Sequence, residues 1–194
     1  MLYLILIVGS MTAIALINAI FNVYCLQFWY ICLAVVINTV AVIVVDGLCA
    51  TVVRRCLPKK WFGVDKTCFC ATEKERVFYN KIGIRKWKDK VPELGMFTGF
   101  RKNHVRKPND NEYLSRYILE ANYGVVCHLV GAIVGYTIIF IYPIKFALCF
   151  GVPVATVNML LNGPPTFILR YNLPKLHSLL KFNNRKKTLS NDLN

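Results

Sequence analysis

The chain has 194 residues, of which 56% are hydrophobic, and its mean hydropathy is +0.45. A soluble domain of this length has roughly 45–50% apolar residues, so the excess argues against an ordinary water-soluble domain and for a membrane protein. A net charge of +14 is also typical of nucleic-acid-binding proteins. Here, however, the basic residues lie in blocks directly beside apolar runs, as the positive-inside rule describes, and we expect no nucleic-acid partner.

Charge and hydropathy alternate along the chain. The first 45 residues carry no charged side chain, whereas residues 54–110 contain 16 Lys/Arg and 6 Asp/Glu, and residues 170–194 contain six Lys/Arg and one acidic residue. Apolar blocks separated by basic blocks are typical of a multispanning membrane protein. The composition therefore predicts an all-α integral membrane protein with about four transmembrane helices.

Residues 1–53 contain two apolar runs, at about 1–24 and 25–45, each near the ~20 residues that cross a bilayer. The connection at 22–27 is very short, so we expect a helical hairpin that serves as a membrane anchor. We expect no cleaved signal peptide, because the first run has no positive start and continues into more apolar sequence. Asp46 follows the second run and is expected near the opposite interface.

Residues 54–115 are expected to form a basic cytoplasmic loop that is partly amphipathic. Within it, Phe78, Ile82 and Trp87 alternate with charges closely enough for an interfacial helix to lie against the lipid surface. Three cysteines cluster in this region, namely Cys56, Cys68 and Cys70. A lone C-x-C without a second pair or a histidine at ligand spacing is a weak zinc signal, so we expect no metal site and leave the role of these thiols open.

Residues 116–182 are expected to form the second transmembrane hairpin, followed by a polar tail at 183–194. Helix-starting residues at 110–112 open a helix that continues into the third span, at about 121–141. Residues 142–145 are expected to make a tight outer turn, and the fourth span, at about 146–169, is expected to be broken at 162–165 (NGPP). Four spans put both termini and the basic loop on the cytoplasmic side; a re-entrant first hairpin is the alternative.

Glu120 and His128 lie at the polar edge and a little inside the third span. Ionisable side chains at membrane depth are costly, so they mark a candidate functional site. Eight helical residues correspond to about 80° around the axis and about 12 Å along it, so the two side chains cannot bond to each other directly. Gly124, Gly131 and Gly135 fall near His128 and allow a helix or an acyl chain to approach closely.

Asn162 in the fourth span is expected at a depth similar to that of His128, where it and Arg170 would converge with Glu120 near the cytoplasmic edge. A neutral histidine is suited to removing a proton from an attacking hydroxyl. The alternative is that His128 only hydrogen-bonds a neighbouring helix through an asparagine. The other two histidines, His104 and His177, are expected at the surface.

Four motifs occur in order: IRKWKDK at 84–90, Glu120 with His128 eight residues later, Asn162-x-Pro164, and RYNLPKL at 170–176. Together they resemble the glycosyl-4,4'-diaponeurosporenoate acyltransferase family of bacterial membrane proteins, over about residues 72–182. That family is associated with the last step of staphyloxanthin-type carotenoid synthesis, in which a fatty acyl chain is attached to a sugar hydroxyl of a glycolipid.

The resemblance implies a multi-pass cell-membrane acyltransferase that transfers a fatty acyl group to a hydroxyl of a glycolipid or related lipid at the cytoplasmic leaflet. Its partners would be membrane lipids, a lipid-linked acceptor, and acyl-CoA or acyl carrier protein as donor, with no further cofactor. His128 would take the hydroxyl proton while Glu120 orients a partner at the mouth of the site. Asn162, or a backbone amide freed at the proline break, would stabilise the oxyanion, and the acyl chain would lie along the glycine face.

Donor and headgroup binding is expected from basic and polar residues around these motifs: Arg85, Lys86, Trp87, Lys88, His104, Arg170, Tyr171, Asn172 and Lys175. Arg170 and Lys175 are equally well explained as snorkelling interface anchors. An alternative function is a non-catalytic four-helix scaffold that binds anionic lipids or partner proteins through the basic loop. A membrane reductase or methyltransferase would need a nucleotide-cofactor motif, and the sequence contains none that we recognise.

Overall fold

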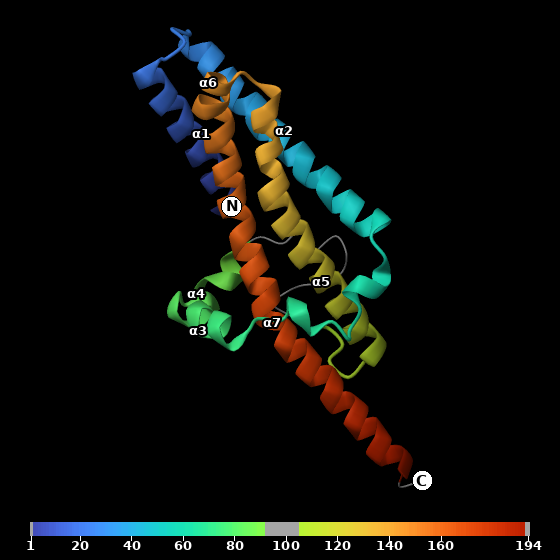
Figure 1. The fold of residues 1–194 in the computed structure, drawn as a ribbon. Helices are drawn as coiled ribbons and strands as arrows, with labels where there is room; N and C mark the ends of the chain where they lie inside the picture. Colours follow the sequence, from blue (N-terminus) through green and yellow to red (C-terminus); the bar gives the residue numbers. More distant parts are fainter. Residues whose placement is uncertain (1, 92–104, 193–194) are drawn as a thin grey trace. The chain divides into compact units, whose positions relative to one another are not determined.

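The computed structural model describes residues 2–91 and 105–192, and every regular element within those ranges is a helix. The long helices are α1 (Leu2–Phe21), α2 (Phe28–Cys56), α5 (Asn111–Val134) and α7 (Val152–Asp192) (Figure 1). Short helices connect them: η1 (Lys59–Phe62), η2 (Thr67–Phe69), α3 (Glu73–Lys81), α4 (Ile84–Trp87), η3 (Lys88–Lys90), η5 (Gly135–Ile141), α6 (Ile144–Phe146) and the π-helical η6 (Ala147–Gly151). The predicted all-α fold is confirmed.

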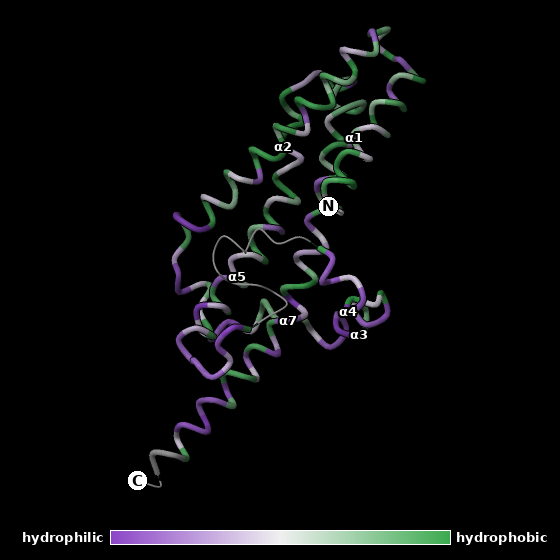
Figure 2. The backbone as a smooth tube through the Cα atoms, turned by 180° about the vertical axis from the view of Figure 1, so that it is seen from behind, coloured by the Kyte–Doolittle hydropathy of each residue, from purple (hydrophilic) through white to green (hydrophobic). Residues whose placement is uncertain are grey.

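Four helical stretches are long and apolar enough to cross a membrane: Leu4–Phe21, Phe28–Cys56, Asn111–Ile141 and Ile144–Leu189. Their outer surfaces expose large apolar side chains, among them Ile20 at 78% and Phe140 at 88% of the full side-chain area. Figure 2 shows the apolar colour along α1 and most of α2, and more polar colour toward the end of α7. Exposed apolar surface of this extent needs a lipid environment, so the chain is a membrane protein.

The predicted turn and helix start are both found. Residues 22–27 connect α1 to α2, and Asn22 adopts a left-handed φ of 33° that asparagine tolerates well. Its side chain closes the turn, because Oδ1 accepts a hydrogen bond from Leu26 N (2.8 Å) and Nδ2 donates to Leu26 O (3.1 Å). At the start of α5, Asp110 Oδ1 accepts from Tyr113 N (3.0 Å), which caps the helix.

The chain divides into two compact units. Unit 1 comprises Met1–Arg55 and Cys127–Pro164, and unit 2 comprises Cys56–Val126 and Pro165–Asn194. The helices α5 and α7 therefore each contribute residues to both units. The predicted division into hairpin, loop, hairpin and tail follows the course of the chain and stays a prediction.

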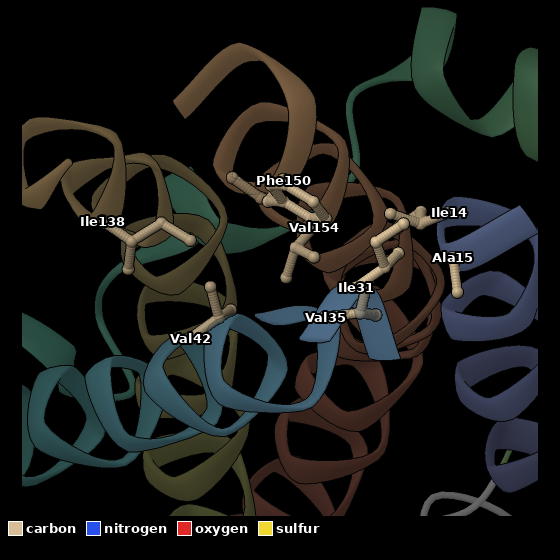
Figure 3. Packing of buried hydrophobic residues seen from close by; sticks show 9 residues of the cluster. Ile14, Ala15, Ile31, Val35, Val42, Ile138, Phe150 and Val154 are labelled. Carbon is tan, nitrogen blue, oxygen red and sulfur yellow. The ribbon is translucent and has the colours of Figure 1, made fainter. Parts of the chain in front are cut away.

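The core of unit 1 is formed by branched aliphatic side chains around one aromatic ring. Val35 and Val42 of α2 pack in a cluster with Ile138, Phe150 and Val154 (Figure 3). All five are at most 5% exposed. This cluster holds α2 against the elements on either side of the 142–143 turn, and it thereby sets the register in which polar side chains of α2 meet those of α5 and α7.

In unit 2, the basic segment is folded onto α5 and the second part of α7. Asn122 of α5 is fully buried and donates from Nδ2 to Phe62 O (2.9 Å), and the Phe62 ring stacks on Tyr123 at 4.1 Å between centroids. Helix α3 buries Tyr79 but exposes Val77 and Phe78. That exposed pair fits the predicted amphipathic segment. The location of the segment on the cytoplasmic side of the membrane stays a prediction.

The predicted break at 162–165 is wrong, because α7 runs as one helix through Pro164 and Pro165. Proline fixes φ near the α-helical value, and each proline removes only one donor from a ladder that is intact on both sides. A proline also leaves a carbonyl without its usual donor rather than an amide without an acceptor. The break that was expected to free a backbone amide is therefore absent at 162–165.

Candidate active site

The imidazole of His128 and the side-chain amide of Asn162 meet in unit 1. His128 lies on α5 and Asn162 on α7, and the distance between His128 Nδ1 and Asn162 Oδ1 is 2.8 Å. Both side chains are half-buried. The predicted proximity of these two residues is confirmed, and it brings together positions that are 34 residues apart in sequence.

Asp46 of α2 completes this arrangement, which sequence analysis did not predict. It lies inside α2 rather than beyond it, and its carboxylate accepts from Asn158 Nδ2 at Oδ1 (3.2 Å) and from Asn162 Nδ2 at Oδ2 (3.2 Å). The first hairpin, expected only to anchor the protein, thus supplies a carboxylate. We call Asp46, His128, Asn158 and Asn162 the His128 network.

Two glycines of the third span make room for this network. A Cβ atom at Gly131 would lie 2.8 Å from Asp46 Oδ1, and one at Gly135 would lie 2.7 Å from Asn158 Nδ2. In unit 2, a Cβ at Gly124 would lie 2.8 Å from a methyl group of Leu169. The space beside these glycines is therefore filled by side chains of the protein, and the expectation that it forms a track for an acyl chain is wrong.

The carboxylate determines the tautomer of the histidine. An ionised carboxylate only accepts hydrogen bonds, so the amide nitrogen of Asn162 faces Asp46 and its oxygen faces His128. An amide oxygen also only accepts, so the proton of the neutral imidazole must be on Nδ1. The other ring nitrogen, Nε2, then carries the lone pair and is the basic atom of the network.

Arg170 and Glu120 both belong to unit 2. Arg170 forms an ion pair with Glu75 of α3, with distances of 3.0 Å from Nε to Oε1 and 2.8 Å from Nη2 to Oε2, and it also donates to the carbonyls of Cys68 and Cys70. These bonds hold the pKa of Glu75 at about 2, well below its usual 4.5. Glu120 is half-buried on α5, and its predicted convergence with His128 stays a prediction.

Two of the motifs that carry the resemblance, at 84–90 and 170–176, meet in unit 2. Arg85 Nε donates to the Tyr171 hydroxyl (2.8 Å), and Lys175 Nζ lies 4.7 Å from the centroid of the Tyr171 ring. Lys88 follows three residues after Arg85, at the start of η3. Trp87 is held by a hydrogen bond from Nε1 to Ile82 O (3.0 Å), so its polar edge contacts the protein's own backbone.

The remaining predicted binding residues are placed as follows. Lys86 is exposed beside a hollow of about 370 Å³ on unit 2, and Asn172 is half-buried on α7. His104 lies outside the described residues. His177, expected at the surface, is half-buried with its Nε2 atom enclosed, and it lines a hollow together with Val64 and Thr67.

Within the described residues no three His, Cys, Asp or Glu side chains are grouped as metal ligands would be, and all eight cysteines are free thiols. Comparison with curated proteins and with solved structures found no match. Comparison with protein families matched residues 58–182, which is more than half of the chain and includes both His128 and Asn162. The chain belongs to the glycosyl-4,4'-diaponeurosporenoate acyltransferase family.

Proposed function

We propose that this protein is a membrane-embedded acyltransferase that moves a fatty acyl group from a thioester donor, acyl-CoA or acyl carrier protein, to a hydroxyl of a glycolipid or related lipid at the cytoplasmic leaflet. The observation that supports this best is the line of hydrogen bonds from Asp46 through Asn162 to His128. It leaves a basic ring nitrogen inside a transmembrane bundle. A hydrogen bond from His128 to Asn162 alone would also serve helix packing, and the carboxylate of Asp46 behind the amide is what favours a base over a packing contact.

In the proposed reaction, His128 Nε2 accepts the proton of the lipid hydroxyl as its oxygen attacks the thioester carbonyl. The tetrahedral intermediate then collapses, the C–S bond breaks, and the sulfur leaves with the proton that the imidazolium returns. The products are an acyl ester and a free thiol. General base catalysis of this kind contributes about 10²–10⁴ in rate.

Asp46 and Asn162 act as positioning residues in this proposal. The carboxylate holds the amide, and the amide holds Nδ1–H, so the imidazole is kept in one tautomer and one orientation. The resemblance implies that Asn162 stabilises the oxyanion. Its Nδ2 group instead donates to Asp46 and to Asn158 (3.1 Å to O, 3.2 Å to Oδ1), so its amide protons are already engaged.

The test is acyl transfer from radiolabelled acyl-CoA and from labelled acyl carrier protein to the lipids of host membranes that contain the protein. Wild-type protein is expected to form a new labelled lipid, and His128→Ala at matched expression is expected to lose at least 99% of that product. His177→Ala serves as the control, because that histidine belongs to the other unit. Absence of any labelled lipid with either donor would contradict the proposed function.

If the labelled lipid forms but His128→Ala makes it at the wild-type rate, the acyltransferase assignment stands and the assignment of His128 as the base falls. The structure of the product lipid, determined by mass spectrometry, names the acceptor in either case.

A further inference from the structure

Unit 2 contains two cations in contact with one buried phenol, Arg85 and Lys175 on Tyr171, and Lys88 follows three residues after Arg85 in the same basic motif. We call these four residues the basic pocket. Tyr171 is only 5% exposed, and its hydroxyl accepts the Arg85 Nε–H bond at 2.8 Å. Lys175, one turn later on α7, has its ammonium 4.7 Å from the ring centroid. The two segments of the pocket are 86 residues apart in sequence.

The charge of the basic pocket is not neutralised within the described residues. Among the ion pairs formed by residues 2–91 and 105–192, none joins Arg85, Lys88 or Lys175 to a carboxylate, and none includes the neighbouring Asp89. By contrast, Arg170 in the same unit is neutralised by its bidentate ion pair with Glu75. Arg85 and Lys175 carry like charges beside one shared residue, so an anion bound between them would be favoured.

The pocket also offers directed donors. Arg85 contacts Tyr171 through Nε, and in the described part of the chain its two Nη groups form a fork of the kind that matches phosphate oxygens. The Tyr171 hydroxyl accepts from Arg85, so its own proton remains available for donation. Beside Arg85 lies a hollow of about 370 Å³ lined by Asn80, Gly83 and Lys86.

Position along α7 supports a ligand that is not buried in lipid. About 20 helical residues cross the hydrocarbon layer, and α7 begins at Val152, so Tyr171 and Lys175 fall at the end of the crossing or beyond it. A single lipid headgroup phosphate carries about one negative charge and so compensates only part of the charge of these cations. A pocket with three cations, an arginine fork and an adjoining hollow fits a ligand with several phosphates on a compact carrier.

We propose that the basic pocket binds the phosphate groups of coenzyme A, and that acyl-CoA is therefore the donor in the reaction proposed above. The assignment of acyl-CoA as the donor rests on that proposed function. The binding of phosphate groups to the basic pocket can be measured without any turnover.

The experiment measures equilibrium binding of adenosine 3',5'-bisphosphate, the phosphate-rich end of coenzyme A, to the purified full chain in nanodiscs of zwitterionic lipid. Arg85→Gln and Lys175→Gln are each expected to weaken the affinity about tenfold or more, because each removes a charge-assisted contact. Tyr171→Phe keeps the packed ring and is expected to weaken it by a smaller factor. Lys186→Gln, an exposed lysine near the end of α7, is the control for net charge and is expected to bind as the wild type does.

Two results would overturn the inference: wild-type protein that does not bind the bisphosphate, or Arg85→Gln and Lys175→Gln proteins that bind it no more weakly than Lys186→Gln. Transfer from acyl carrier protein alone, unaffected by Arg85→Gln, would overturn it while leaving the acyltransferase function intact. Conversely, normal bisphosphate binding without transfer to any lipid would uphold the pocket and contradict the proposed function. The His128→Ala variant distinguishes the basic pocket from the proposed function, because it is expected to bind the bisphosphate normally and to lose acyl transfer.

Discussion

At the residue scale, Gly131 lies directly against the carboxylate of the His128 network. Gly131→Ala places a methyl group 2.8 Å from Asp46 Oδ1, and the end of a flexible side chain can move away at little energetic cost. We therefore expect near-normal stability but a clear loss of acyl transfer, about tenfold or more, because the carboxylate no longer holds Asn162 in place. The measurements are the transfer rate and the thermal unfolding midpoint.

Gly47→Ala is the matched control, since it follows Asp46 on the same helix and a Cβ there meets nothing within 4 Å. It is expected to keep full transfer activity. Equal activity of the two variants would mean that the position of the Asp46 carboxylate does not matter for the reaction.

His128 could be predicted from sequence because a histidine well inside an apolar run has few explanations other than a functional or bonded group. Asp46 carries the same chemical signal, but a carboxylate at the end of an apolar run is equally well explained as an interface residue. Only the continuation of α2 to Cys56 puts it within the helix. The tautomer of His128 could not be predicted at all, because it follows from a contact between α2 and α7.

At the scale of the element, α3 is fastened at its first turn by Glu75. Thr72 and Glu75 form a capping box, which the spacing T-x-x-E already indicates in the sequence. The ion pair between Glu75 and Arg170 spans 95 residues and follows only from the fold. Glu75 therefore links a local helix-start signal to a long-range contact in unit 2.

Glu75→Gln separates these two roles, because glutamine also serves in a capping box. It removes the charge opposite a largely buried Arg170 and is expected to lower the free energy of unfolding by about 1–2 kcal/mol. Thr72→Ala, which removes the cap and leaves the charges, is expected to cost about 1 kcal/mol. Unfolding of the purified protein followed by circular dichroism measures both; no destabilisation by Glu75→Gln would contradict the role of the ion pair.

Low pH should also destabilise the folded protein through Glu75. The pKa of Glu75 is about 2 in the folded chain and 4.5 when unperturbed, so the unfolded chain binds the proton more readily. The stability that Glu75 contributes is therefore fully present above about pH 4.5 and is lost as the pH falls toward 2. The difference in stability between wild-type protein and Glu75→Gln should accordingly shrink between pH 5 and pH 3, and a constant difference over that range would contradict this explanation.

At the scale of the whole molecule, the four spans were predictable because hydropathy and length alone identify them. The folding of the basic segment onto α5 and α7 is not predictable in this way, because it depends on long-range contacts such as the hydrogen bond from Asn122 to Phe62 O. The continuity of α7 through two prolines was missed for a similar reason. A local rule that disfavours a helix was outweighed by the helix on both sides.

The proposed topology puts both termini and the basic segment in the cytoplasm, and native cysteines report on it. Cys25 is exposed in the 22–27 connection and Cys68 is exposed in the basic segment. In variants that retain only one of these thiols, a membrane-impermeant maleimide is expected to label Cys25 in intact cells and Cys68 only after permeabilisation. Labelling of Cys68 in intact cells would reverse the orientation.

The most direct test of the central claim, that Asp46 acts through Asn162 to make His128 the base, is the rate of acyl transfer by Asp46→Asn. An asparagine no longer fixes which way the Asn162 amide faces, so the transfer rate is expected to fall about 10–100-fold while the protein remains folded. Asp110→Asn is the matched control, because asparagine caps α5 as well as aspartate does and transfer should be unchanged. Wild-type transfer by Asp46→Asn would contradict the claim.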